Sequence, residues 1–256
     1  MPHRFHHDGF ELAYVDVPAE GAPGEPVLLI HGFASSHAVN WVGPGWVSTL
    51  SKAGYRVVAL DNRGHGLSSK SYDPADYYPD RMAADAAALL DHLAIPRAHI
   101  MGYSMGARIA AFMALAFPDK VASLIFGGLG IGLVDGVGDW SPIASALVAE
   151  DPATVTDPRG RAFRAFADQT RSDRHALAAC IETSRVLVSA GDLARITRPT
   201  LVAVGTKDDI GGAAEPLARL MPNAESFAIE GRDHMLAVGD RTFKARALEF
   251  LRDHPI

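Results

Sequence analysis

Short apolar segments alternate with helical patterns along almost the whole chain, and this alternation restricts the fold more than any other feature. Residues 27–30, Val-Leu-Leu-Ile, are apolar at every position, which is typical of a strand buried on both faces of a sheet. Other segments with the length and composition of strands are 11–17, 55–60, 99–103, 122–126, 200–204 and 225–229. Strands separated by helices predict βαβ units and a mostly parallel sheet in an α/β fold.

The segments between these strands have the periodicity of helices. Apolar residues recur at helical spacing across residues 82–93, 109–117 and 243–251. Asp240 precedes the last of these segments and is expected to cap that helix. The helices supply the crossover connections that a parallel sheet needs.

One long segment interrupts the alternation. Residues 131–196 contain no convincing strand and are too long for a simple connection. We therefore expect a helical cap over residues 131–196, inserted into a core domain formed by residues 1–130 and 197–256.

Composition and charge argue against several kinds of partner. The chain has 24 Lys and Arg and 30 Asp and Glu, so its formal net charge is 24 − 30 = −6. No basic run stands out, and we expect neither nucleic acid nor a membrane as a partner. Cys180 is the only cysteine, the first residues lack a signal-peptide pattern, and the uncharged run 121–134 is too short to span a bilayer. These features predict a cytoplasmic protein.

Two clusters of polar residues have simple interpretations. Three histidines, His3, His6 and His7, lie on what we expect to be a mobile terminus, and we interpret them as surface residues rather than metal ligands. A group of arginines in the expected cap alternates with aspartates and is interpreted as a solvated helical face; its members are Arg159, Arg161, Arg164, Arg171 and Arg174. The alternative for the arginines is a patch that steers an acidic substrate. We expect no metal and no cofactor.

Residues 102–106, Gly-Tyr-Ser-Met-Gly, have the pattern G-x-S-x-G. The pattern alone is weak, but here it ends a predicted strand and leads into the helix predicted over 109–117. A strand, a tight turn and a helix make up a nucleophile elbow, in which the serine has strained backbone angles. We therefore predict that Ser104 is a nucleophile.

A serine needs a base, and the base needs a carboxylate that orients it. His234 follows the last predicted strand, so it can reach the sheet edge at which Ser104 lies. Asp208 follows the strand at 200–204, and its neighbour Asp209 stays open as the alternative. We prefer Asp208 because of its position in the loop that begins at Gly205, and the order Ser–Asp–His is that of the α/β-hydrolase triad.

The remaining site residues follow from the same geometry. An oxyanion needs backbone N–H donors, and we assign these to Met105, which follows the nucleophile, and to Phe33 after the strand at 27–30. His31 is expected to fix the loop that carries Phe33. Apolar and aromatic side chains placed to line a substrate pocket are Phe33, Trp41, Tyr103, Met105, Leu129, Trp140 and Met235. For Trp41 and Trp140, core packing is an equally good explanation.

These motifs together resemble the α/β-hydrolase superfamily, and small bacterial serine esterases in particular. The matching segments are 31–33 (His-Gly-Phe), 61–66 (Asp-Asn-Arg-Gly-His-Gly), 102–106, 205–208 and 231–234 (Gly-Arg-Asp-His). The resemblance implies an eight-stranded, mostly parallel sheet flanked by helices, with a small helical cap after the sixth strand that forms the acyl or alcohol pocket. It also implies that the turn at 61–66 is architectural.

The favoured function is hydrolysis of a small soluble carboxylic ester through an acyl-serine intermediate, by a carboxylesterase-like enzyme. The alternatives are a carbon–carbon bond hydrolase, a lactonase or a lyase that uses the same triad on an acidic substrate. Residues 104–108, Ser-Met-Gly-Ala-Arg, resemble the menaquinone-pathway lyase, whereas the turn at 61–64 differs from that enzyme's version. Otherwise Arg108 is interpreted as a residue on the polar side of its helix. A third hypothesis, from another class, is a non-catalytic ligand-binding module.

Overall fold

The computed structural model describes residues 2–21 and 23–256. A single eight-stranded sheet runs through its centre, with the strand order β1-β2-β4-β3-β5-β6-β7-β8. The strands are β1 (His3–His7), β2 (Phe10–Val17), β3 (Pro26–Ile30), β4 (Arg56–Leu60), β5 (Ala98–Tyr103), β6 (Val121–Gly127), β7 (Thr200–Gly205) and β8 (Ala224–Ile229). The pairs β1/β2 and β2/β4 are antiparallel and the other pairs are parallel, which confirms the predicted eight-stranded, mostly parallel sheet.

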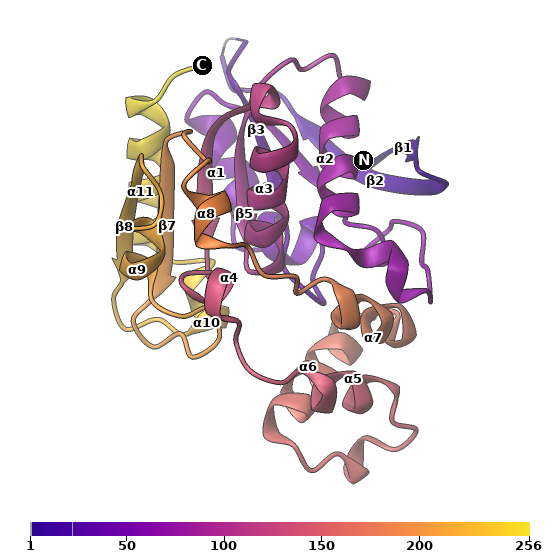
Figure 1. Cartoon of the computed structure of the whole chain (residues 1–256). Coiled ribbons are helices and arrows are strands. Elements are labelled where there is room, and N and C mark those ends of the chain that lie inside the picture. The colour runs from indigo at the N-terminus through magenta and orange to yellow at the C-terminus, as the bar shows by residue number, and fades with distance from the viewer. Residues whose placement is uncertain (1, 22) are drawn as a thin grey trace.

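Helices cover both faces of the sheet (Figure 1). Those of the core are α1 (Trp46–Lys52), α2 (Pro79–His92), α3 (Met105–Ala116), α9 (Ala214–Ala218), α10 (His234–Ala237) and α11 (Arg241–Asp253). Single turns of other helix types occur at η1 (Ala38–Val42), η2 (Pro74–Tyr77) and η3 (Pro118–Lys120). Asp240 caps α11 as predicted, since its side chain accepts hydrogen bonds from two N–H groups of the first turn.

The strand β3 shows why its sequence is apolar throughout. Leu28 and Ile30 belong to the hydrophobic core on the side of α2 and α3, whereas Val27 and Leu29 belong to the core on the side of α1 and α11. Successive side chains of a strand point to opposite faces, and both faces are covered here. All four side chains are completely buried.

The prediction of a mobile N-terminus is wrong. Residues His3–His7 form β1, which pairs with β2 and extends the sheet by one antiparallel strand. Phe5 is buried against Tyr14, and His7 Nδ1 lies 2.7 Å from Asp85 Oδ1. The polar sequence concealed this strand because β1 is an edge strand that is exposed along most of its length.

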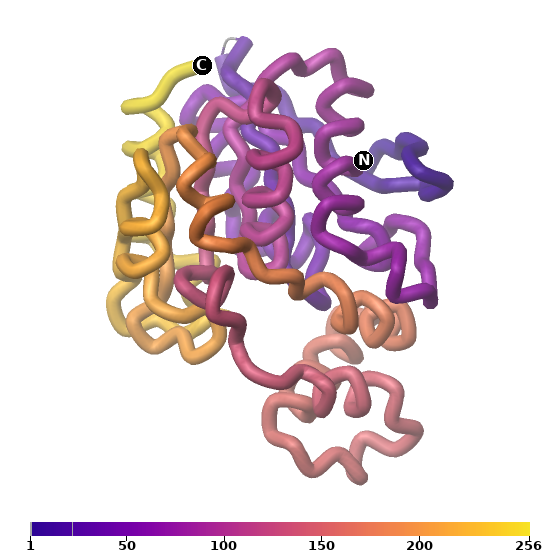
Figure 2. Tube along the Cα trace, in the orientation of Figure 1, coloured from indigo at the N-terminus to yellow at the C-terminus, as the bar shows by residue number. Residues whose placement is uncertain are grey.

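Every residue between β6 and β7 is described, and none of them lies in a strand. The helices here are α4 (Gly132–Asp135), α5 (Ser141–Val148), η4 (Pro152–Thr154), α6 (Pro158–Gln169), α7 (Arg174–Thr183) and α8 (Ala190–Leu193). Figure 1 shows α5 and α6 set apart from the sheet at one end of the molecule, and Figure 2 traces the chain out to them and back. In the part of the chain that the structure describes, no helix is long and apolar enough to cross a bilayer.

The parallel strands bring distant segments to the same edge of the sheet. Ser104 follows β5, the loop with Phe33 follows β3, Asp208 follows β7 and His234 follows β8. These four strands are parallel, so their carboxyl ends all lie at the same edge of the sheet. Residues that are up to about 200 positions apart in sequence therefore meet at this edge, which is where open α/β sheets bind their ligands.

Candidate active site

Ser104 occupies a strained turn between β5 and α3. Its backbone angles are φ 53° and ψ −112°, a region that typically costs a residue other than glycine about 1–3 kcal/mol. The turn is tight on both sides, since a Cβ on Gly102 would lie 2.1 Å from the Gly106 carbonyl oxygen and one on Gly106 would lie 1.9 Å from the Ile30 carbonyl oxygen. Both glycines of the motif are therefore required by backbone packing, and the serine is held at the N-terminus of α3.

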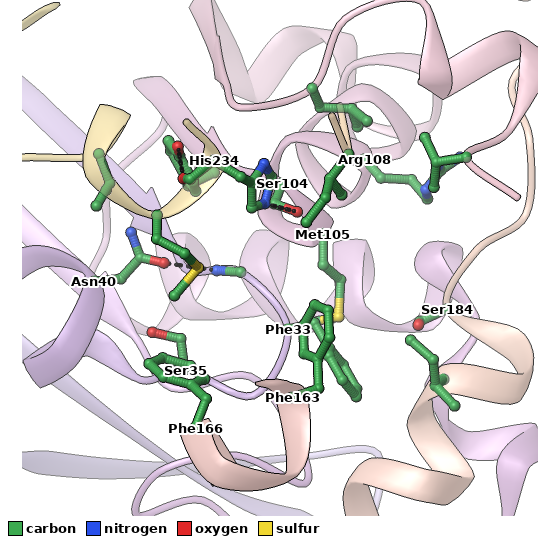
Figure 3. A pocket seen from close by; sticks show the side chains of 18 of the residues that line it. Phe33, Ser35, Asn40, Ser104, Met105, Arg108, Phe163, Phe166, Ser184 and His234 are labelled. Atoms are coloured by element: carbon green, nitrogen blue, oxygen red, sulfur yellow. Dashed lines mark hydrogen bonds between the residues drawn. The ribbon is translucent and has the colours of Figure 1, made fainter. Parts of the chain in front are cut away.

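The Ser104 hydroxyl is linked to His234 (Figure 3), and His234 is linked in turn to Asp208. Ser104 Oγ lies 3.1 Å from His234 Nε2, and His234 Nδ1 lies 2.8 Å from Asp208 Oδ2. A carboxylate can only accept, so Nδ1 must carry the proton of a neutral imidazole and Nε2 is left as an acceptor. The arrangement can take the proton of the serine hydroxyl and stabilise the imidazolium that results.

Asp208 is held rigidly in this chain of hydrogen bonds. Its Oδ1 accepts from the N–H groups of Ile210 at 2.9 Å and Gly211 at 2.8 Å, while Oδ2 faces the histidine. Burial by itself would raise the pKa of Asp208, but the hydrogen bond and charge of His234 and the two backbone donors lower it below the usual value. Asp209 is exposed, so of the two adjacent carboxylates only Asp208 contacts His234.

Two further contacts fix the position of His234. It is the first residue of α10, and Asp233 caps this helix by accepting from the N–H groups of Met235 at 3.0 Å and Leu236 at 2.8 Å. Tyr103 precedes the serine in sequence, and its hydroxyl donates to the His234 carbonyl at 2.6 Å. The residue that precedes Ser104 therefore ties the histidine loop to the elbow.

The N–H groups of Phe33 and Met105 make no hydrogen bond to any residue that the structure describes. Met105 is the first residue of α3, where free N–H groups and the helix dipole favour negative charge. The loop of Phe33 is fixed one residue earlier, because the Gly32 N–H donates to Asn40 Oδ1 at 2.9 Å. Gly32 also packs closely against the elbow, since a Cβ there would lie 3.2 Å from the Tyr103 carbonyl oxygen.

His31 is a structural residue, as we expected. Its Nδ1 lies 2.7 Å from the Gly32 carbonyl and therefore carries the proton, while Nε2 accepts from the Asn62 N–H at 3.0 Å. Complete burial lowers the pKa of His31, in agreement with a ring that uses Nε2 as an acceptor and is therefore neutral near neutral pH. Asp61 supports the same region by accepting from His37 Nδ1 at 2.9 Å and from the His37 N–H at 2.6 Å. Burial alone would raise the pKa of Asp61, but these hydrogen bonds and the two imidazoles hold it at about 2.

A cavity of about 400 Å³ opens beside the serine, within the range of small-molecule sites. Its lining includes Ser104, His234 and the loop of Phe33. It also includes residues of α6 and α7, with Trp140 just before α5 and Arg185 just after α7. Figure 3 shows Phe163 near Phe33 on the side of α6. The lining is mostly apolar and includes Phe33, Met105, Leu129, Trp140, Phe163, Phe166 and Ile181.

The family model described as the alpha/beta hydrolase fold matches residues 25–178 of the chain. The protein belongs to this family. The match includes the Phe33 loop, the turn at 61–66 and the serine elbow, which are three of the five segments whose resemblance the sequence indicated; the other two, 205–208 and 231–234, lie beyond the matched residues.

Relatives of this α/β hydrolase carry several activities. The dihydrolipoyllysine-residue acetyltransferase component of the acetoin cleaving system of Pseudomonas putida is 29% identical over 99% of this chain and 70% of that protein. The 3-oxoadipate enol-lactonase 2 of Acinetobacter baylyi is 28% identical over 63% of this chain and 64% of that protein. A hydrolase from Pseudomonas aeruginosa has a TM-score of 0.81 and 27% identity, with 97% of each chain covered. Hydrolysis is the activity class that these comparisons support.

Four of the five residues assigned only to the substrate pocket line the cavity of this α/β hydrolase: Tyr103, Leu129, Trp140 and Met235. The fifth, Trp41, does not, and its assignment to the pocket is wrong. Trp41 is completely buried in the core beneath α1 and α11, where its ring meets Trp46 edge-to-face at 6.2 Å between centroids. Its neighbour Asn40 lines the cavity instead. Adjacent residues of the η1 turn point in different directions, and the sequence does not show which one faces the site.

Sequence reasoning missed several residues of the site. Asn40 holds the Gly32 N–H, and no motif marks an asparagine for that role. Phe163 and Phe166 line the cavity from α6, in the stretch that we interpreted as a solvated face. Their spacing of three residues is a helical signal that the surrounding charged residues obscured. Phe163 packs on Trp140, with 5.1 Å between the ring centroids.

Two arginines are less exposed than expected, whereas Arg161 and Arg171 are exposed as predicted. Arg164 is buried, donates to Asp168 Oδ2 at 2.9 Å and to the Ala149 carbonyl at 2.7 Å, and so ties α6 to the end of α5. Arg108, which we interpreted as a residue on the polar side of α3, is 3% exposed and lines the cavity. Both corrections have one cause: the helical segment after β6 covers surfaces that would otherwise face solvent.

Proposed function

We propose that this α/β hydrolase cleaves small carboxylic esters through an acyl-serine intermediate on Ser104. The observation that carries the proposal is the continuous chain of hydrogen bonds from Ser104 Oγ through His234 to Asp208. Serine is a weak nucleophile near neutral pH, and this chain supplies the base that it needs. The free N–H groups of Phe33 and Met105, on the same side of the elbow, support the proposal with two donors for an oxyanion.

The proposed reaction has two halves. Ser104 Oγ attacks the ester carbonyl while His234 Nε2 takes the hydroxyl proton, and the oxyanion that forms accepts from the Phe33 and Met105 N–H groups. The C–O bond to the alcohol then breaks, and the alcohol leaves with the proton from His234. In the second half, His234 takes a proton from water, the hydroxide attacks the acyl carbon, and the serine regains its proton as the acid departs. Asp208 stays ionised throughout and orients the imidazole.

The pocket favours small substrates of this class. Its volume of about 400 Å³ is near the lower end for ligand sites. We propose that residues 131–196 act as the cap that closes this pocket, and that the substrate is a small ester in solution rather than one at a lipid surface. The mixed charge of α6 supports this, because charged groups are costly to bury against lipid. A cytoplasmic location belongs to the same proposal and is supported by the single, buried Cys180.

A fluorophosphonate probe and a series of p-nitrophenyl esters from acetate to palmitate test the proposal together. We expect the probe to label Ser104, and short esters to be hydrolysed faster than long ones. With tributyrin, we expect no jump in rate where the substrate passes its solubility limit. An unlabelled Ser104 would favour a non-catalytic binding module, and a preference for palmitate would identify the helical segment as a lipase lid. Labelling without turnover of any ester would favour the lactone, carbon–carbon or lyase alternatives.

A further inference from the structure

In the part of the chain that the structure describes, two arginines and no carboxylate-bearing residue line the cavity beside Ser104. Arg108 and Arg185 both belong to its lining, and none of the other lining residues is Asp or Glu. The chain as a whole carries a formal charge of −6, so a positive pocket does not follow from its composition. A concave, mostly apolar site that holds two cations is a place where an anion is strongly favoured.

Arg108 is a buried charge that has no counter-ion among the described residues. It is 3% exposed, and the partners of its guanidinium are three backbone carbonyls, at residues 132, 133 and 186, of which the last lies at 2.6 Å. These carbonyl oxygens accept from Nη1 and Nη2 but do not balance the charge, and Nε makes no hydrogen bond to a described residue. Burial lowers its pKa to about 10, which leaves the group protonated at neutral pH.

The other buried arginines of this chain are paired. Arg63 contacts both oxygens of Asp85 at 2.7 Å, and Arg164 contacts Asp168 at 2.9 Å. A buried cation is costly unless an anion accompanies it. Arg108 differs from these two in that it faces the cavity, where a ligand can supply the anion.

Arg185 and Arg159 both lie against Trp140, a residue that lines the cavity. Arg185 stacks on the Trp140 ring with its guanidinium carbon 3.6 Å from the centroid, and Arg159 lies 5.0 Å from that centroid. The buried Nη2 of Arg159 has no hydrogen-bond partner among residues 2–21 and 23–256. Burial, together with the charges of Arg108 and Arg159, lowers the pKa of Arg185 to about 9. Arg108, Arg159 and Arg185 thus lie near one another, and none of them forms an ion pair with a carboxylate of the described residues.

The distance between the arginines and Ser104 limits the length of a ligand that contacts both. Arg108 follows Ser104 by four residues, so it lies one turn further along α3, a rise of about 6 Å. Figure 3 shows Arg108 beside Ser104 and Met105. Apolar side chains, among them Met105 and Leu129, line the cavity as well. A ligand that meets both ends has a reacting carbonyl, a short apolar spacer and a terminal anion.

We propose that Arg108 and Arg185 bind a carboxylate on the substrate, so that the preferred ester has an acyl chain ending in a carboxylate. The planar guanidinium matches the two oxygens of a carboxylate, and stacking on Trp140 holds the fork of Arg185 in one plane. The proposal rests on the proposed function only in that it places the reacting carbonyl at Ser104. The pocket then selects half-esters of short aliphatic dicarboxylic acids over neutral esters of the same length.

Binding to the full-length Ser104→Ala variant, measured by calorimetry, tests the proposal without turnover. Methyl hydrogen adipate and methyl hexanoate have the same length and differ only in a terminal carboxylate against a methyl group. We expect the anionic ester to bind at least about 10-fold more tightly, as charged hydrogen bonds predict. Equal affinity for the two esters would overturn the proposal. Tighter binding of hexyl phosphate than of methyl hydrogen adipate would overturn the choice of a carboxylate.

The Arg185→Gln substitution, made in the Ser104→Ala variant, tests whether Arg185 binds the carboxylate. Arg185 makes no hydrogen bond to another described residue, so its replacement leaves the backbone contacts of the fold in place. We expect the affinity for the anionic ester to fall about 10-fold or more, with that for methyl hexanoate unchanged within about 2-fold. The matched control is Arg161→Gln, which removes the same charge from an exposed position of α6 and is expected to change neither affinity. An equal loss for both esters in Arg185→Gln would show a packing role and would contradict the proposal.

A measurement of ester hydrolysis by the wild-type chain separates this inference from the proposed function. In the wild-type chain, we expect kcat/KM for 4-nitrophenyl hydrogen adipate to exceed that for 4-nitrophenyl hexanoate, after subtraction of the uncatalysed rate. If Ser104→Ala prefers the anionic ester while the wild-type chain hydrolyses neither, the ester-hydrolase proposal fails and the anion site stands. If both esters are hydrolysed without preference and Ser104→Ala binds them equally, the anion site fails and the esterase proposal stands.

Discussion

Replacement of Asp208 by asparagine is the sharpest test of the proposed site, because the structure fixes how the new side chain must lie. The Ile210 and Gly211 N–H groups donate to one carboxylate oxygen at 2.9 and 2.8 Å. The asparagine introduced by Asp208→Asn would keep its amide oxygen on these two donors, which leaves its NH₂ group facing His234 Nδ1. Two donors cannot face one another, so Nδ1 must become an acceptor and the imidazole proton must move to Nε2.

This exchange of tautomers disables the base without removing a contact. A proton on Nε2 points at Ser104 Oγ, so His234 can no longer accept the serine proton in the ground state. For a serine, histidine and aspartate arranged in this way, the loss in kcat is about 10⁴-fold, which corresponds to about 5 kcal/mol in the activation barrier. The fold should survive, because the substitution is nearly isosteric and keeps both backbone hydrogen bonds.

Initial rates with p-nitrophenyl butyrate and thermal melts of the same preparations provide the measurement. Asp209→Asn is the matched control: it makes the same chemical change one residue away, at an exposed carboxylate, and we expect activity within about 2-fold of wild type. If Asp208→Asn kept more than about a tenth of the wild-type kcat, the orienting role of Asp208 would be refuted. A larger loss in Asp209→Asn than in Asp208→Asn would assign that role to Asp209.

Three more substitutions test other contacts of the structure. Ser104→Ala should abolish ester turnover and leave the melting temperature nearly unchanged; residual activity above about a tenth of wild type would reject Ser104 as the nucleophile. Gly106→Ala should lower the free energy of unfolding in urea by about 3 kcal/mol or more, since its methyl would lie 1.9 Å from the Ile30 carbonyl oxygen. Gly191→Ala, whose methyl would lie 3.7 Å from its nearest neighbour, is the control, and equal losses in the two variants would contradict the reasoning. The pKa of Asp61 is about 2 in the folded state and 3.8 in its ordinary state, so its contribution to stability is present above pH 4 and is lost as the pH falls towards 2. The stability advantage of wild type over Asp61→Asn should therefore shrink by about 1 kcal/mol between pH 5 and pH 3, and an advantage that stays constant would show that Asp61 does not titrate in this way.

The sequence by itself determined the parts of the site that depend on local geometry. The serine elbow was predictable because a strand, two glycines that backbone packing requires and a helix are consecutive in the chain. Asp208 and His234 could be placed because each directly follows a strand of a parallel sheet, and such strands end at one edge. The parallel core was predictable for a related reason, since strands covered on both faces must be apolar at every position.

Only the tertiary structure decided which side chains cover one another. Trp41 and Asn40 are neighbours in sequence, yet one lies in the core and the other at the cavity, because the η1 turn directs them differently. The polar residues of β1 gave no strand pattern, since an edge strand needs little burial and takes its register from β2. Arg108 has the composition of a surface residue, and it is buried because a helical segment far along the chain folds over it. Burial of this kind depends on how the elements assemble. The sequence around a charged residue does not reveal which segment will cover that residue, nor whether an anion will lie beside it.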